Sequence, residues 1–152
     1  MKKLLLSFLL LTTSFLISSC EGTPPKDLGV QDQGPALKKC PQSPNCVISF
    51  YPQDKEHYLE PIKTEHPGEK AYKNILNLLQ KFPRVTIVKK RGNYIRAEFK
   101  SSVFGFVDDV EFYFGETGKI HFRSASRMGH WDLGVNHDRM EKIRFKYQQR
   151  DY

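Results

Sequence analysis

Residues 104–139 read FGFVDDVEFYFGETGKIHFRSASRMGHWDLGVNHDR, and this stretch decides how the chain folds. Apolar and polar side chains alternate along residues 104–114 and again along residues 119–126, which is the pattern of half-buried β-strands. Gly115 and Gly118 stand between the two runs, where a turn requires residues of this kind. The stretch therefore predicts an antiparallel β-hairpin that carries paired acids and arginines.

The two predicted strands have faces of unequal character. One face of the first strand carries Phe104, Phe106, Asp108, Val110, Phe112 and Phe114. Matching the apolar faces predicts three cross-strand pairs: Phe112 with Phe122, Glu111 with Arg123, and Asp108 with Ser126. Successive side chains of a strand point to opposite faces, so Asp109 lies away from Asp108 and the two acids cannot flank one bond as a glycosidase pair does.

A helix and a second hairpin are predicted before this stretch. Residues 68–82 repeat apolar side chains at three- and four-residue spacing, and Pro83 ends the run. Residues 84–90 and 94–100 alternate around a turn that contains Gly92. Both elements supply apolar faces that can pack with the first hairpin.

The remaining segments complete an α+β domain. Residues 47–51 predict either an edge strand or a packed loop, and residues 53–67 predict an irregular connection. A final helix is expected to start at Asn136 as its N-cap and to bury the stripe Met140, Ile143 and Tyr147. The order helix, four strands, helix predicts a single small domain with a curved antiparallel sheet of about four strands packed with two helices.

The N-terminus has the features of a lipoprotein signal peptide. Two lysines precede an apolar run, and Ile17-Ser18-Ser19-Cys20 resembles the lipobox in which the cysteine of bacterial lipoproteins is acylated. We expect residues 1–19 to be removed, residues 20–36 to form a flexible tether after lipidated Cys20, and residues 37–152 to form one globular domain. An ordinary signal peptide with an incidental cysteine is the alternative.

Charge and the leader together indicate the compartment and the partners. Loss of Lys2 and Lys3 with the leader lowers the formal charge from +7 to +5, which is too mild for a nucleic-acid-binding surface. We expect attachment to a membrane through the N-terminal lipid, a domain in the periplasm or outside the cell, and an anionic envelope ligand as a possible partner. Glu21 is not the aspartate that often retains lipoproteins in the inner membrane, which favours the outer membrane if the cell has two membranes.

Cys40 and Cys46 are predicted to form a disulfide. Disulfides persist outside the cytoplasm, and the prolines at positions 41 and 44 favour a turn between the two thiols. Free thiols, or a redox or metal site, are the alternatives, but the spacing matches no common zinc site. No metal and no cofactor are therefore predicted.

Polar residues of the opening stretch form the candidate ligand-binding site. They are Asp108, Asp109, Arg123, Ser124, Ser126, Arg127, Asp132, Asn136 and Arg139. One interpretation is a structural network that holds the strand to residues 128–135, because a carboxylate in a phenylalanine-rich face needs a partner. The other is that the arginines converge on an anionic or polyhydroxyl ligand.

Catalysis has the weakest support in the sequence. Ser124 and Ser126 lack the glycines of a nucleophile elbow, and the histidines at positions 121, 130 and 137 are not at metal-ligand spacing. We assign no catalytic residue. A binding or envelope-maintenance module is the main hypothesis, and a hydrolase of a cell-envelope polymer is the alternative.

Four blocks in the same order resemble the domain-of-unknown-function family 1499. The blocks are residues 40–47 (CPQSPNCV), 104–112 (FGFVDDVEF), 123–127 (RSASR) and 132–136 (DLGVN). The resemblance implies a small bacterial domain, often lipid-anchored or membrane-associated, and implies no established activity. His137 stands where a basic residue is expected, so Arg139 is the better match to the arginine of the last block.

Overall fold

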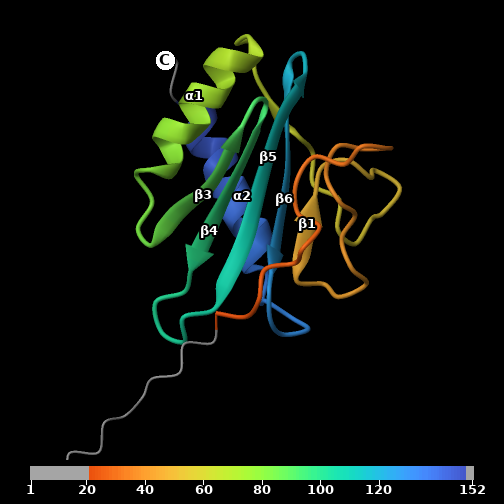
Figure 1. The fold of residues 1–152 in the computed structure, drawn as a ribbon, viewed down its shortest axis with the longest axis vertical. Helices are drawn as coiled ribbons and strands as arrows, with labels where there is room; N and C mark the ends of the chain where they lie inside the picture. The colour runs from red at the N-terminus through yellow and green to blue at the C-terminus, as the bar shows by residue number, and fades with distance from the viewer. Residues whose placement is uncertain (1–20, 150–152) are drawn as a thin grey trace, which may run out of the picture.

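Two helices pack on one face of an antiparallel sheet in the computed structural model, which describes residues 21–149 (Figure 1). The elements are β1 Cys46–Ile48, β2 Ile62–Lys63, α1 Gly68–Leu79, β3 Val85–Arg91, β4 Tyr94–Lys100, β5 Val107–Glu116, β6 Lys119–Ser126 and α2 Val135–Gln148. Within the described residues the sheet has six strands in the order β1-β6-β5-β4-β3, and β2 also pairs with β6. This architecture confirms the predicted α+β class.

The two short strands are the difference from the predicted sheet of about four. β1 resolves the alternative for residues 47–51 in favour of an edge strand over its first part, since it pairs with β6 from Cys46 to Ile48. β2 lies within residues 53–67, so the prediction of an irregular connection is wrong at Ile62 and Lys63. Two or three residues are too few to show a period-two pattern in a sequence.

The predicted register of the central hairpin is confirmed. Three pairs of β5 and β6 residues lie opposite one another as expected: Asp108 with Ser126, Glu111 with Arg123, and Phe112 with Phe122. The first strand begins later than predicted and extends further, because β5 runs from Val107 to Glu116. Phe104 and Phe106 lie outside it with 66% and 41% of their surfaces exposed, so their assignment to the buried face is wrong.

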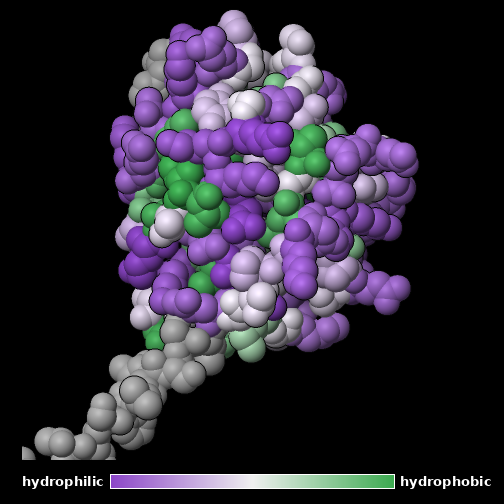
Figure 2. Space-filling view, in the orientation of Figure 1, coloured by the Kyte–Doolittle hydropathy of each residue, from purple (hydrophilic) through white to green (hydrophobic). Residues whose placement is uncertain are grey.

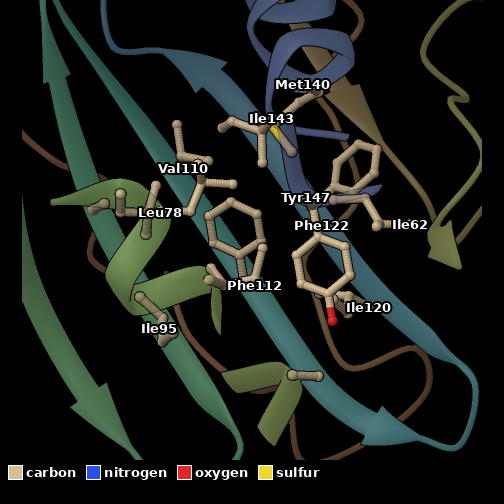
Figure 3. Packing of buried hydrophobic residues seen from close by; sticks show 14 of the residues in the cluster. Ile62, Leu78, Ile95, Val110, Phe112, Ile120, Phe122, Met140, Ile143 and Tyr147 are labelled. Atoms are coloured by element: carbon tan, nitrogen blue, oxygen red, sulfur yellow. The ribbon is translucent and has the colours of Figure 1, made fainter. Parts of the chain in front are cut away.

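The main core lies between the sheet and the two helices. Phe112 and Phe122 are fully buried at its centre, and Figure 3 shows their rings among side chains from α1 and α2. The α2 side chains that contribute are Met140, Ile143 and Tyr147, as the sequence predicts. Burying one large apolar side chain stabilises a fold by roughly 1.5–3 kcal/mol, so this layer holds the helices on the sheet.

The N-terminal segment covers part of the other face of the sheet. A second cluster of buried side chains forms there from Leu37, Cys40, Cys46, Ile48, Tyr94 and Ala125. The predicted disulfide is present within it, with the Cα atoms of Cys40 and Cys46 5.8 Å apart. In Figure 1 α2 lies behind the sheet, and Figure 2 shows that the face toward the viewer is mostly polar with smaller apolar patches.

Part of the segment predicted as a tether contacts the domain. Gly29 is buried, and its backbone N–H donates to the Glu111 carboxylate over 2.9 Å. Cys20 and the predicted signal peptide lie outside the described residues, so lipidation and cleavage stay predictions. Residues 21–36 are described, and their flexibility as a tether also stays a prediction. Within residues 21–149, neither helix has the length and apolar character needed to cross a bilayer.

β3 forms one edge of the sheet, and its pairing with β4 is irregular. The register shifts between Ile87 and Lys89, which marks a β-bulge. The residues after the bulge, Lys89, Lys90 and Arg91, are exposed. At the opposite edge β1 is covered by a returning segment, because Leu59 N–H donates to Ile48 O over 3.0 Å.

Replacing both disulfide cysteines with serine (Cys40→Ser with Cys46→Ser) should lower the free energy of unfolding by about 2 kcal/mol, because the short closed loop restricts the unfolded chain. Urea denaturation followed by circular dichroism measures the change. Reductant added to the wild type should reproduce it. Unchanged midpoints in both samples would show that the disulfide does not stabilise the domain.

Candidate functional site

Asp108 lies on the helix-facing side of β5 and pairs with Arg139 of α2. The two side chains form an ion pair, and each is only 11% exposed. The Asp108 neighbours across the sheet are Phe99 and Ser126, so a carboxylate here needs a cation nearby. The sequence predicts that this carboxylate needs a partner, and α2 supplies it.

Arg139 connects the acid to the rest of a polar network. Its Nη1 donates to Asn136 Oδ1 over 2.7 Å and to Ser124 Oγ over 3.1 Å. Its guanidinium carbon lies 4.8 Å from the centre of the Phe99 ring, within the range of a cation–π contact. Contacts within the protein therefore hold the Arg139 side chain in one orientation without a ligand.

Asn136 is fully buried at the centre of this network. Its Nδ2 lies within hydrogen-bonding distance of three acceptors: Asn45 O at 3.1 Å, Ser126 Oγ at 3.0 Å and Asp132 Oδ2 at 2.8 Å. These contacts link α2 to β6 and to the residue before β1. Loss of its side chain would leave several buried polar groups without partners.

The start of α2 differs from the prediction. The helix begins at Val135 after Gly134, which has a φ of 79°, so Asn136 lies inside the helix and is not its N-cap. Asp132 satisfies amides of this turn, accepting from Gly134 N–H over 3.0 Å and Asn136 N–H over 2.8 Å. An acidic side chain is well suited to this position because of the helix dipole. Asp132 thus has a structural contact of its own.

Asp109 and Arg127 form a second polar group on the opposite face of the sheet. Arg127 binds Asp109 through two hydrogen bonds of 2.8 and 2.9 Å and also forms an ion pair with Glu98. The hydrogen bond to Asp109 raises the pKa of Arg127. Because this fork is already filled by carboxylates, Arg127 is used within the protein.

Glu111 and Arg123 lie beside this group and are buried. Glu111 accepts from Tyr94 Oη over 2.7 Å, from Gly29 N–H over 2.9 Å and from Arg123 Nη1 over 3.4 Å. Burial raises the pKa of Glu111 above 4.5, although these three partners act in the opposite direction. Tyr94 and Gly29 were not predicted to touch the site, and no local pattern marks them.

The nine candidate residues therefore divide between the two faces of the sheet. Those on the helix side are Asp108, Ser124, Ser126, Asp132, Asn136 and Arg139, and those on the other side are Asp109, Arg123 and Arg127. The expectation that the three arginines converge is wrong, because β6 alternates and α2 lies on one face only. Whether any of these residues binds a ligand stays a prediction. Asp108 and Asp109 lie on opposite faces of the sheet, so they cannot flank one substrate bond as a glycosidase pair does.

A groove of about 440 Å³ opens on the helix side beside the Asp108–Arg139 pair. Arg84 and Lys142, both exposed, stand on its rim. Arg84 adopts a left-handed backbone with a φ of 55°, uncommon for a residue other than glycine, and its Nε donates to Lys100 O over 3.2 Å. Neither Arg84 nor Lys142 is among the nine residues predicted from the sequence.

Within residues 21–149, no three histidine, cysteine or acidic side chains lie close enough together to hold a metal ion. The histidines do make local contacts. His121 Nε2 lies 2.8 Å from Glu116 Oε2, and His57 Nδ1 lies 2.9 Å from Asp54 Oδ1. Hydrogen bonding to Lys119 and then His121 lowers the pKa of Glu116.

The raised pKa of Glu111 predicts a pH-dependent stability difference between the wild type and Glu111→Gln. Glu111 binds its proton more tightly in the folded chain, so the wild type should lose stability relative to the variant as pH rises above about 4.5. Each pKa unit corresponds to about 1.4 kcal/mol. Urea denaturation at a series of pH values measures the difference.

Glu69→Gln is the matched control for this measurement. In the wild type, the hydrogen bond from Lys73 lowers the pKa of Glu69. The wild type should therefore lose stability relative to Glu69→Gln as pH falls. A Glu111→Gln difference that does not change with pH would contradict the prediction.

Comparison with known proteins gives a family and no activity. A family model described as "Protein of unknown function (DUF1499)" matches residues 36–146. A search of curated proteins found no match to the chain. The matched residues contain the disulfide, the sheet and the polar network on both of its faces, in agreement with the resemblance of the four sequence blocks. The chain therefore belongs to the DUF1499 family of proteins of unknown function.

Proposed function

We propose that this protein is a lipid-anchored cell-envelope protein whose domain binds an anionic ligand in the groove beside Asp108 and Arg139. The observation that carries the proposal is the pair of exposed cations on the rim, Arg84 and Lys142. Among the residues that the structure describes, neither forms an ion pair with an acid. Arg84 and Lys142 line the groove together with one exposed acid, Asp138, and this excess of exposed cations favours a ligand that carries phosphate or carboxylate groups.

The floor of the groove is suited to orienting such a ligand. Arg139 is held by Asp108, Asn136 and Ser124, so it loses little side-chain freedom when a ligand arrives. Asp108 neutralises part of its charge and disfavours ligands that cannot offer a donor to the carboxylate. A ligand with both an anionic group and hydroxyl groups matches this combination.

The proposed anchor rests on the lipobox-like residues that end at Cys20. An acylated cysteine would hold the domain at the membrane, where anionic lipids and envelope polymers present the required groups at high local concentration. Binding in the groove then needs only modest intrinsic affinity. A binding module or a protein that maintains the envelope agrees with both features.

Glycerol phosphate and glucuronate are suitable probes of the groove, because one carries phosphate and the other carboxylate with hydroxyl groups. Arg84→Gln and Lys142→Gln should each weaken binding about tenfold, since a hydrogen bond to a charged group contributes about 1.5–3 kcal/mol. Titration followed by NMR chemical shifts measures affinity and location together.

Lys73→Gln on α1 is the control for these variants, because Lys73 is exposed and lies outside the groove. It should leave the affinity unchanged. Chemical-shift changes that spread evenly over the surface, or an equal loss in all three variants, would show non-specific attraction and reject the groove as the site.

Lipidation at Cys20 predicts an intact mass greater than that of the peptide that begins at Cys20. The purified protein should fractionate with membranes, and Cys20→Ala should abolish the added mass. The Cys40→Ser and Cys46→Ser double variant should keep both properties, because these cysteines form the disulfide. A wild-type protein with the unmodified peptide mass would reject the anchor.

A further inference from the structure

Exposed apolar side chains gather in two loops of the domain. The loop between β4 and β5 presents Val103 and Phe104, 76% and 66% exposed, and the loop between β6 and α2 presents Trp131 and Leu133, 68% and 73% exposed. Phe106 and Met128, also exposed, belong to the same loops, and we call these six residues the apolar end. Apolar groups of this size on a small domain indicate an interaction surface.

The sheet brings the two loops to the same end of the molecule. Lys100 pairs with Val107 across β4 and β5, and Asp108 pairs with Ser126 across β5 and β6. Both loops therefore leave the sheet at the same end of its strands. Arg127 N–H also donates to Val107 O over 3.1 Å. Figure 1 shows both loops at this end, below the strands of the sheet.

Local hydrogen bonds hold the loops in these conformations. Ser101 N–H donates to Phe106 O over 2.8 Å, and Phe106 N–H donates to Ser101 Oγ over 2.9 Å. Asp132 fixes the second loop, where Leu133 has a left-handed backbone with a φ of 58°. Residues other than glycine rarely adopt this backbone, so the turn held by Asp132 sets the conformation of Leu133.

The described part of the chain begins at the apolar end. Glu21 forms an ion pair with Lys100, the last residue of β4. Gly22 packs so closely on the second loop that a Cβ atom built on it would lie 2.8 Å from Met128 Cγ. Cys20 directly precedes Glu21 in the sequence, so the segment that would carry the acyl chains joins the described domain beside the apolar end.

We infer that the apolar end is a membrane-docking surface that enters the interface of the bilayer holding the Cys20 acyl chains. The inference rests on the proposed lipid anchor and specifies how the domain sits on the membrane. Tryptophan and phenylalanine partition well into the interfacial region, and the anchor keeps the surface next to it. The domain lies on the membrane with a fixed end toward it, instead of standing off on a free tether.

Trp131 is the single tryptophan of the chain, so its fluorescence reports on the apolar end alone. The purified lipidated chain is incorporated into vesicles of phosphatidylethanolamine and phosphatidylglycerol. Docking should shift Trp131 emission to shorter wavelength, reduce quenching by iodide and permit quenching by brominated lipid. Emission that stays at the position of solvent-exposed tryptophan, with iodide quenching unchanged, would overturn the docking surface.

Two phenylalanine variants of the lipidated chain separate docking from general hydrophobicity. Phe104→Ser should lower the ratio of docked to undocked protein about tenfold, because it removes one inserted aromatic side chain. Phe145→Ser is the matched control: Phe145 is 60% exposed, and it lies ten residues, or about 15 Å, along α2 from Val135. An equal effect of both variants would overturn the inference.

The outcomes distinguish failure of docking from failure of the anchor. A lipidated mass with solvent-exposed Trp131 rejects docking and leaves the anchor in place. If the mass shows no lipid, the same unlipidated chain is mixed with excess vesicles, and the Trp131 shift decides the docking surface by itself. A shift that appears without vesicles, together with self-association in sedimentation, would assign the apolar end to a second copy of the chain and overturn the inference.

Discussion

The ion pair between Asp108 and Arg139 is the interaction on which the arrangement of this domain depends. β5 places a carboxylate in an otherwise apolar face, and such a group is destabilising unless a cation and hydrogen bonds accompany it. Arg139 satisfies it only when α2 lies in its observed position. Ser124 and Asn136 then orient Arg139 in turn. The polar network therefore selects one placement of the helix, whereas the apolar core by itself would accept several.

On the opposite face of the sheet, buried acids are also stabilised by partners within the protein. Glu111 is buried under the N-terminal segment and is stabilised by Tyr94, Arg123 and the backbone of Gly29. Asp109 is held by Arg127. β5 thus carries acids on both faces, with Arg139 as the partner on the helix side and Arg123 and Arg127 as partners on the other. This distribution explains why a sequence rich in acids and arginines gives two internal networks, one on each face of the sheet.

The alternation of residues 107–126 was sufficient to predict the central hairpin and its register, because one face is buried and a shift of one residue would invert every side chain. The stripe on α2 was predictable for the same reason. The partner of Asp108 was not, because α2 approaches from a distance in sequence that no local pattern encodes. Arg84 and Gly29 likewise acquire their roles through tertiary contacts. The start of β5 was predicted too early, because the exposed side chains of Phe104 and Phe106 continue the apolar alternation before the first residue of the strand.

The irregular edge of the sheet has a consequence for molecules held close together. A regular edge strand presents unpaired N–H and C=O groups that can join the sheet of a neighbour, which is a route to aggregation. In β3 the bulge between Ile87 and Lys89 interrupts that row, and Lys89 and Lys90 bring positive charge to it. A second copy would have to desolvate these lysines and pair with a broken ladder. The domain can therefore be crowded on a surface without polymerising through its sheet.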